Sequence, residues 1–252
     1  LGLSLGWRFG FLFLGIMAIA IALLSFALYK EPPVPAIVSS VRTGATADFA
    51  PQVTRRSVRH LLKDRGIWLT GFAGFAIGAV EFALAGHLVL YLTEALLFPV
   101  VTAGAIMALT QAGGILGKPG GGLLSDRLFN GSRRMIFMLW AIISAVVCLL
   151  LALLGANLSW ALYPLLFILG MTAIGWGGIY LTMVAELAGA ENTGTAVGIA
   201  GVISMVGFLI GPIVFGYLVD ATRSYQLAWL SQTVFATLSA IALYFVKEGN
   251  RA

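Results

Sequence analysis

The chain has 252 residues, of which 60% are hydrophobic and only 10% are charged, and its mean hydropathy is +0.99. A soluble domain carries about 25% charged residues, so this composition excludes a soluble globular protein and indicates that lipid surrounds most of the chain. A formal net charge of +5 is compatible with a nucleic-acid partner. The basic residues, however, are distributed as in a membrane protein, so we expect no nucleic-acid partner.

Several apolar stretches are long enough to cross a bilayer. A helix that rises about 1.5 Å per residue needs roughly 20 apolar residues to span a hydrocarbon core about 30 Å thick. The stretches cover residues 9–28, 67–92, 101–124, 135–155, 160–187, 193–219 and 226–246. Segments of alternating polarity, which are typical of a membrane β-barrel, do not occur. The sequence therefore predicts an all-α polytopic membrane protein with about seven transmembrane helices.

The first stretch, 9–28, differs from a secretory signal peptide because its apolar run is longer than the expected 7–15 residues or so. The chain begins with Leu1 rather than Met, and we expect a missing N-terminal portion. The single cysteine, Cys148, lies within the predicted fourth helix and cannot form an intrachain disulfide.

The basic residues indicate the orientation in the membrane. When the segments between helices are assigned alternately to two sides, Arg8 and Arg223 fall on one side and the remaining Lys and Arg residues on the other. An excess of basic residues marks the cytoplasmic side of a membrane protein. We therefore expect an integral protein of the cytoplasmic (inner) membrane, with the N-terminus outside and the C-terminus in the cytoplasm.

One predicted loop, 29–66, is long and divides the first helix from the other six. It begins with a proline-rich segment that cannot continue a helix. Val58, Leu61 and Leu62 then recur at helical spacing among basic residues. This pattern suits either a short helix on the inner membrane surface or a solvated basic loop. The helices after the loop form one structural unit, which can divide into two triplets of opposite orientation.

The connection between the third and fourth helices carries a distinctive motif. Its glycines allow close approach of a neighbouring backbone, its acid can accept hydrogen bonds at a helix N-terminus, and its arginines can bridge to carboxylates or lipid headgroups. The motif resembles the cytoplasmic Gly-x-x-x-Asp-Arg signature of the major facilitator superfamily, in which this element gates the cytoplasmic side during alternating access. The matching residues are Gly122, Asp126, Arg127, Arg133 and Arg134. The alternative is a basic cytoplasmic loop without a gating role.

The sixth predicted helix contains a second motif, which is similar to the glycine-proline motif of the same family. It consists of Gly198, Gly207, Gly211, Pro212 and Gly216. The glycines predict a face for close helix packing, and the proline permits a bend where neighbouring helices satisfy the freed carbonyl. Phe215 replaces one glycine of the family pattern. Many membrane helices contain such glycines through composition alone, so a packing motif and chance remain the two interpretations.

The resemblance covers nearly the whole chain. It implies that residues 1–28 are the last helix of an N-terminal half, that 29–66 are the cytoplasmic central loop, and that 67–252 form the C-terminal transport half. The partners are then the lipid bilayer, a small-molecule substrate and the missing N-terminal half of the same protein. The implied function is secondary active transport of a small organic solute, with an organic anion as one candidate and a proton or sodium ion as the coupling ion. No cofactor and no metal are implied.

Polar groups within the predicted helices are the candidates for substrate binding and coupling. An ionisable group at mid-membrane costs roughly 2.5–3.5 kcal/mol on insertion scales, and Glu81 lies near the centre of the second helix. Its side chain either faces a water-filled cavity, where it binds a proton or a cationic group, or is protonated or hydrogen-bonded and holds two helices together. His87 lies on a different face of the same helix and contacts substrate or anchors near the outer interface. Trp176 and Tyr180 lie in a glycine-rich part of the fifth helix. The family resemblance implies that they line the substrate cavity, and the alternative is that they face lipid.

Other polar residues are weaker candidates. Glu186 and Asp220, near helix ends, suit capping or gating better than ligand binding, and Gln111 is a minor candidate. Efflux of hydrophobic compounds by the same fold is an alternative function, and a seven-helix receptor is a second one. An intramembrane enzyme is disfavoured because no catalytic motif is present.

Overall fold

The computed structural model describes residues 3–29, 58, 60–189 and 191–246. The chain divides into two compact units, Leu1–Gln52 and Val53–Ala252. In the described part of the first unit, α1 (Leu3–Leu28) is a single apolar helix. Its apolar side chains, such as Phe11 and Leu24, are exposed within this unit, as expected for a helix whose surroundings are lipid or other helices.

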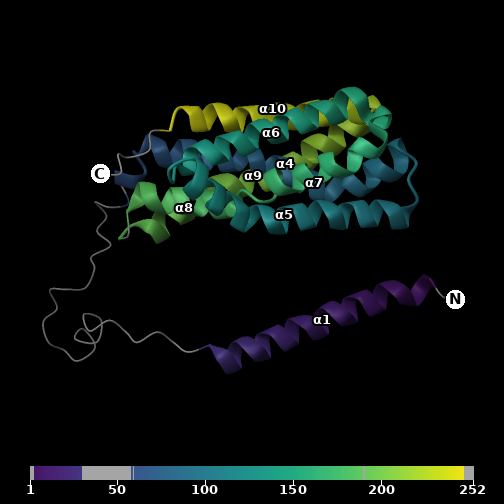
Figure 1. The fold of residues 1–252 in the computed structure, drawn as a ribbon, viewed down its shortest axis with the longest axis horizontal. Helices are drawn as coiled ribbons and strands as arrows, with labels where there is room; N and C mark the ends of the chain where they lie inside the picture. Colours follow the sequence, from purple (N-terminus) through teal and green to yellow (C-terminus); the bar gives the residue numbers. More distant parts are fainter. Residues whose placement is uncertain (1–2, 30–57, 59, 190, 247–252) are drawn as a thin grey trace, which may run out of the picture. The chain divides into compact units, whose positions relative to one another are not determined.

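The second unit is an all-helical bundle (Figure 1). Its helices, in chain order, are α4 (Arg65–Leu90) with a π-turn η2 (Tyr91–Ala95), α5 (Val100–Leu128), α6 (Arg133–Leu154) with a 3-10 segment η3 (Gly155–Ala161), α7 (Leu162–Ala173), α8 (Gly177–Ala188), α9 (Thr193–Thr222) and α10 (Tyr225–Tyr244). We refer to it as the α4–α10 unit. Within the described residues of the whole chain, seven segments are long and apolar enough to cross a membrane, which confirms the predicted fold class.

One predicted span ends later than expected, and another, whose limits agree with the prediction, is interrupted. The third span does not end at residue 124, because α5 continues through Pro119 to Leu128, so Asp126 and Arg127 lie in the last helical turn rather than in a loop. The fifth span is not one continuous helix, since a turn at residues 174–176 separates α7 from α8. The glycines on both sides of this turn lower the helix propensity of the segment.

The helix ends follow local capping chemistry. The Asp64 side chain accepts a hydrogen bond of 2.7 Å from the Gly66 amide at the start of α4. Ser132 caps α6 through the Met135 amide at 3.3 Å, and Ser224 caps α10 in the same way. These side chains satisfy amides that have no partner inside the helix.

Glycines hold the closest helix pairs together. A Cβ atom at Gly207 or Gly211 of α9 would collide with the Phe75 or Ala79 carbonyl group of α4. The same close approach joins α5 and α7, where glycines of each helix face the backbone of the other. Membrane helices associate mainly through such close packing because lipid provides little hydrophobic driving force between them.

The pairing of the helices is symmetrical between two triplets. The first triplet is α4, α5 and α6, and the second is α7–α8, α9 and α10. The first member of each triplet packs on the second member of the other, as α4 on α9 and α7 on α5, and the third members, α6 and α10, pack on each other. This arrangement has the pattern expected of two inverted repeats.

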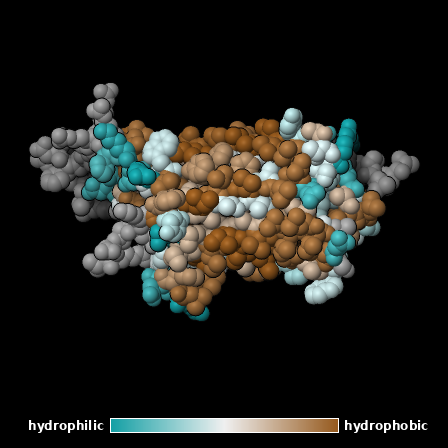
Figure 2. Space-filling view, turned by 90° about the horizontal axis from the view of Figure 1, so that it is seen from above, coloured by the Kyte–Doolittle hydropathy of each residue, from teal (hydrophilic) through white to brown (hydrophobic). Residues whose placement is uncertain are grey.

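The surface of the bundle has the polarity of a membrane protein. On the face formed by α6 and α10, hydrophobic residues cover the middle and hydrophilic residues gather toward the ends (Figure 2).

The predicted loop 29–66 lies outside the described residues except for Tyr29, Val58 and residues 60–66. Just before α4, the Leu62 amide donates a helical hydrogen bond of 3.0 Å to the Val58 carbonyl oxygen, and Leu61 is buried. The described part of this segment, for which the sequence left open a surface helix or a solvated loop, thus forms a helical turn.

Candidate substrate and coupling site

Glu81 and Trp176 meet in the interior of the α4–α10 unit. Glu81 is half-buried on α4, and Trp176, which is 4% exposed, ends the turn between α7 and α8. The Trp176 Nε1–H group donates a hydrogen bond of 2.8 Å to Glu81 Oε2. The interaction therefore connects the middle of one membrane helix to the point where another is interrupted.

Tyr180 extends this site by one turn of α8. Its hydroxyl group is hydrogen-bonded to that of Ser204 on α9 at 2.8 Å, and its ring packs edge-on against Trp176 with a centroid distance of 5.0 Å. Phe137 of α6 stacks on Trp176 at 5.8 Å and also contacts the Tyr180 ring, at 6.4 Å. These two rings pack on the Trp176 indole and help to hold its orientation toward Glu81.

One cation, Lys118, lies farther inside a membrane span than the sequence predicted. It belongs to α5, and its side chain is exposed in the isolated unit. The sequence interpretation grouped Lys118 with the cytoplasmic loop charges because the third helix was expected to end soon after it. Because α5 continues for ten residues beyond Lys118, this residue lies within the span and not at its end.

His87 lies apart from the Glu81 site. Its ring packs against Phe215 of α9 at 4.9 Å, and its Nε2 atom would lie 3.1 Å from a Cβ atom at Gly216. Within the described part of the chain, its Nδ1 atom has no hydrogen-bond partner. The structure thus brings Glu81, Trp176 and Tyr180 together and places His87 in a separate environment between α4 and α9.

The Arg-Arg motif lies at one end of the unit. Arg133, the first residue of α6, forms an ion pair of 2.9 Å with Asp126 and approaches Glu186 of α8 at 3.6 Å. It also donates a hydrogen bond of 3.3 Å to the Gly122 carbonyl oxygen. Arg133 therefore joins the ends of α5, α6 and α8, and Glu186, which was expected to cap or gate, is one of its partners.

The other two arginines of that motif, Arg134 and Arg127, behave differently. Arg134 donates a hydrogen bond of 2.9 Å to the Val246 carbonyl oxygen and a longer one of 3.4 Å to that of Tyr244, and so holds the end of α10. Arg127 is exposed. The motif thus contains one arginine in a charge cluster and one that binds backbone carbonyl groups.

The glycine-proline motif divides in the same way. Gly207 and Gly211 pack directly on the α4 backbone, and Gly216 faces His87, whereas Gly198 is exposed with nothing within 4 Å of its Cβ position. Pro212 lies inside α9, which continues past it to Thr222. The packing function therefore belongs to Gly207 and Gly211.

Within the described residues, no group of three or more His, Cys, Asp or Glu side chains is placed to hold a metal ion. The acidic and aromatic groups around Glu81 can bind a proton, orient a polar solute and stack against a ring. They include no nucleophile activated by a neighbouring base.

Comparison with known proteins agrees with this architecture. The chain matches the family model described as Major Facilitator Superfamily over residues 1–207. The chain belongs to the major facilitator superfamily. Its backbone is also similar to that of the fucose:proton symporter FucP of E. coli, with a TM-score of 0.69 and 17% sequence identity over 98% of this chain and 56% of that one.

Two relatives illustrate what the family includes. A hexuronate transporter of Bacillus subtilis (strain 168) is 23% identical over 254 residues, which cover 96% of this chain and 58% of the relative. The membrane sensor protein UhpC of Escherichia coli (strain K12) is 29% identical over 217 residues, which cover 81% of this chain and 49% of the relative. This chain thus spans about half the length of these relatives.

Proposed function

We propose that this major facilitator chain carries a small organic anion across the inner membrane by alternating access, and that Glu81 couples the movement to a proton. The observation that carries the proposal is the hydrogen bond from Trp176 to Glu81 at the interruption between α7 and α8. Membrane-embedded acids of this kind are costly and are typical of ion and substrate pathways.

Protonation of Glu81 weakens its bond to Trp176. An N–H group binds an ionised carboxylate roughly twice as strongly as a neutral acceptor. When Glu81 takes up a proton, α4 is held less firmly to the α7–α8 turn, where two short helices can change their relative angle. Proton uptake and rearrangement of the cavity are thereby linked.

Lys118 is the candidate for the positive charge that attracts an anion, because it lies within the α5 span, ten residues before the end of that helix. The comparison with a hexuronate transporter and with a fucose:proton symporter supports this pairing of a small carbohydrate-like solute with a proton.

We further propose that the α4–α10 unit acts as the C-terminal half of the transporter, with α1 belonging to the other half and the loop between them in the cytoplasm. The match to about half of each relative's length supports this assignment. In this arrangement the Arg133 cluster lies at the cytoplasmic end and closes it when the cavity opens outward. The distribution of Lys and Arg described above supports the orientation.

The test is uptake of radiolabelled glucuronate, a hexuronate, into bacterial cells that express the protein together with any flanking coding sequence of its gene. Glu81→Gln should abolish the acceleration by an inward proton gradient while leaving exchange of substrate across the membrane. Trp176→Phe, which keeps the ring and removes the donor, should reduce the gradient effect. Glu191→Gln, at an exposed position, is the matched control and should behave like the unsubstituted protein. Full gradient-driven uptake by Glu81→Gln would refute the coupling.

Similarity to a membrane sensor protein favours a second candidate, in which the same site binds a solute to produce a signal without net flux. Binding of glucuronate without uptake, in cells where the protein is present in the membrane, would support the sensor. Export of hydrophobic dyes from the cells, with no effect of glucuronate, would instead support multidrug-type efflux.

A further inference from the structure

The helical turn just before α4 presents two exposed cations. Lys63 and Arg65 are both exposed, and within the described part of the chain neither forms an ion pair. Asp64 lies between them in the sequence, but its carboxylate accepts the hydrogen bond of 2.7 Å from the Gly66 amide and so caps α4. The turn therefore carries positive charge that is available to a partner outside the described residues.

Apolar surface lies directly beside these cations. The Leu62 side chain is 47% exposed and that of Trp68 is 48% exposed. The Trp68 Nε1–H group donates a hydrogen bond of 2.8 Å to the Leu62 carbonyl oxygen, so the indole has no polar atom left to satisfy and its exposed surface is apolar. The same bond holds the turn against the start of α4. Two apolar side chains and two cations are thus combined in one short, well-ordered surface.

The position of this surface along α4 matches a membrane interface. Trp68 lies three residues, or about 4.5 Å along the axis, from the start of the span Arg65–Ala95, and Trp is enriched at membrane–water interfaces. Phe72, one turn farther along, is 39% exposed and stacks on Phe75 at 5.5 Å. Phe75 packs edge-on against Phe235 of α10 at 6.1 Å. The cations therefore lie at the level of lipid headgroups, and an exposed aromatic row continues from them toward the hydrocarbon beside α10.

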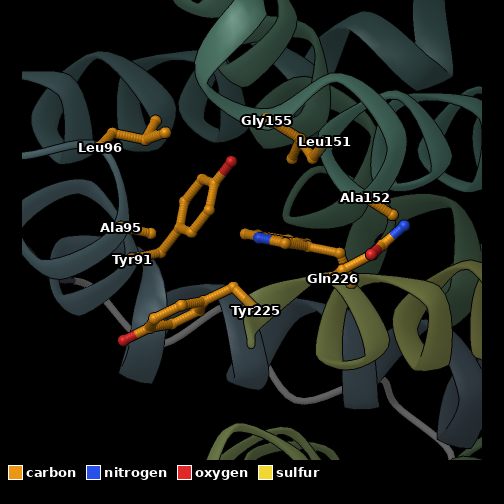
Figure 3. A pocket seen from close by; sticks show the side chains of 9 residues that line it. Tyr91, Ala95, Leu96, Leu151, Ala152, Gly155, Tyr225 and Gln226 are labelled. Atoms are coloured by element: carbon orange, nitrogen blue, oxygen red, sulfur yellow. The ribbon is translucent and has the colours of Figure 1, made fainter. Parts of the chain in front are cut away.

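The opposite end of the α4–α10 unit has a different surface. A hollow of about 160 Å³ at that end is lined by residues without charge, among them Tyr91 and Trp229 (Figure 3). Two acids, Glu94 and Asp220, are exposed there together with one cation, Arg223. Acidic side chains repel an anionic headgroup, so among the described residues the turn before α4 is the better match for one.

We propose that the turn before α4 and Trp68 together form a binding surface for an anionic phospholipid. Lys63 and Arg65 bind the phosphate of the headgroup, and Leu62 and Trp68 lie against the upper part of the acyl chains. Each basic residue close to an anionic membrane surface raises the affinity about 5-fold. A soluble anion would be attracted by the same cations but would leave the two apolar side chains in water, so the partner is a lipid. The surface requires neither transport nor proton coupling.

The experiment measures amide hydrogen exchange in residues 61–66 by mass spectrometry, with the protein in nanodiscs of two compositions. One contains phosphatidylcholine alone, and the other contains equal parts of phosphatidylcholine and phosphatidylglycerol. Exchange should be at least about 5-fold slower in the phosphatidylglycerol discs. The double variant Lys63→Gln with Arg65→Gln should lose this difference while its exchange in phosphatidylcholine stays unchanged. Arg127→Gln, which removes an exposed cation at the same end, is the matched control and should keep the difference.

Leu62→Gln tests the apolar part of the surface. It should speed exchange of the turn in both kinds of nanodisc, because insertion of Leu62 does not depend on the charge of the headgroup. Glycerol phosphate added to phosphatidylcholine discs should not slow exchange, since a soluble phosphate lacks acyl chains. Thermal unfolding in phosphatidylcholine discs establishes that each variant is folded.

Four outcomes would overturn the proposal. Exchange could be equal in the two lipid compositions, the double variant could retain the difference, glycerol phosphate could reproduce the effect, or Leu62→Gln could leave exchange unchanged in both discs. Because no step involves Glu81 or movement of a substrate, the result is independent of the uptake experiment above.

Discussion

Gly207→Ala provides a direct test of how α4 and α9 are held together. The added methyl group would collide with the Phe75 carbonyl oxygen, and since this is backbone, no side-chain rotation can relieve the collision. The two helices must separate locally, which lengthens the other contacts along their interface, including the approach of Gly211 to Ala79.

The size of the effect follows from two opposing terms. Overpacking a well-packed interior costs about 1–3 kcal/mol, while replacing Gly by Ala within a helix returns roughly 0.5–1 kcal/mol. A net loss of about 1–2 kcal/mol corresponds to a decrease in Tm of roughly 2–8 °C for a chain of this size. Gly198→Ala is the control, because its Cβ position is open and only the favourable helix term applies.

The assay is thermal unfolding of both variants in the same nanodiscs, followed by near-UV circular dichroism. Gly207→Ala should unfold at a lower temperature than the unsubstituted chain, and Gly198→Ala at the same or a higher temperature. Equal melting temperatures for the two variants would mean that the α4–α9 contact is looser than the structure shows.

Three further predictions concern single side chains. Arg133→Gln removes the ion pairs to Asp126 and Glu186 and should speed amide hydrogen exchange in the turn before α6 several-fold, although overall stability should fall by only about 1 kcal/mol because the acidic partners are partly exposed; unchanged exchange would show that Arg133 does not hold these helix ends together. Arg134→Gln releases the Val246 carbonyl and should increase hydrogen exchange at the end of α10 but not in α5, as measured by mass spectrometry. Tyr91→Phe removes a hydroxyl without a described protein partner, so the free energy of unfolding should stay within about 0.5 kcal/mol of its original value or rise; a large loss in chemical unfolding experiments would show that the hydroxyl is already bound.

The sequence by itself was sufficient for the membrane-spanning architecture. Hydropathy and length determine whether a helix is stable in lipid, and both can be read without knowing any neighbour. The glycine-rich part of the fifth span around Trp176 could also be read from the sequence, and the charged motif ending in Arg133 and Arg134 was found through its resemblance to the family signature.

The sequence could not determine which faces of the helices meet. Most of these spans are apolar all around, so periodicity does not distinguish an inward face from a lipid-exposed one. Trp176 and Glu81 are 95 residues apart, and their contact depends on where α4 crosses the α7–α8 turn. The depth of Lys118 within its span depended in the same way on how far α5 extends.

Tertiary packing also decided which members of each motif have a structural function. Gly207 faces a neighbouring backbone whereas Gly198 does not, although both fit the same pattern. The hollow beside Tyr91 and Trp229 had no sequence signal, because it is produced by three segments that converge from different parts of the chain. A lipid environment favours helical segments, but a site forms only where particular side chains and backbone segments pack closely together.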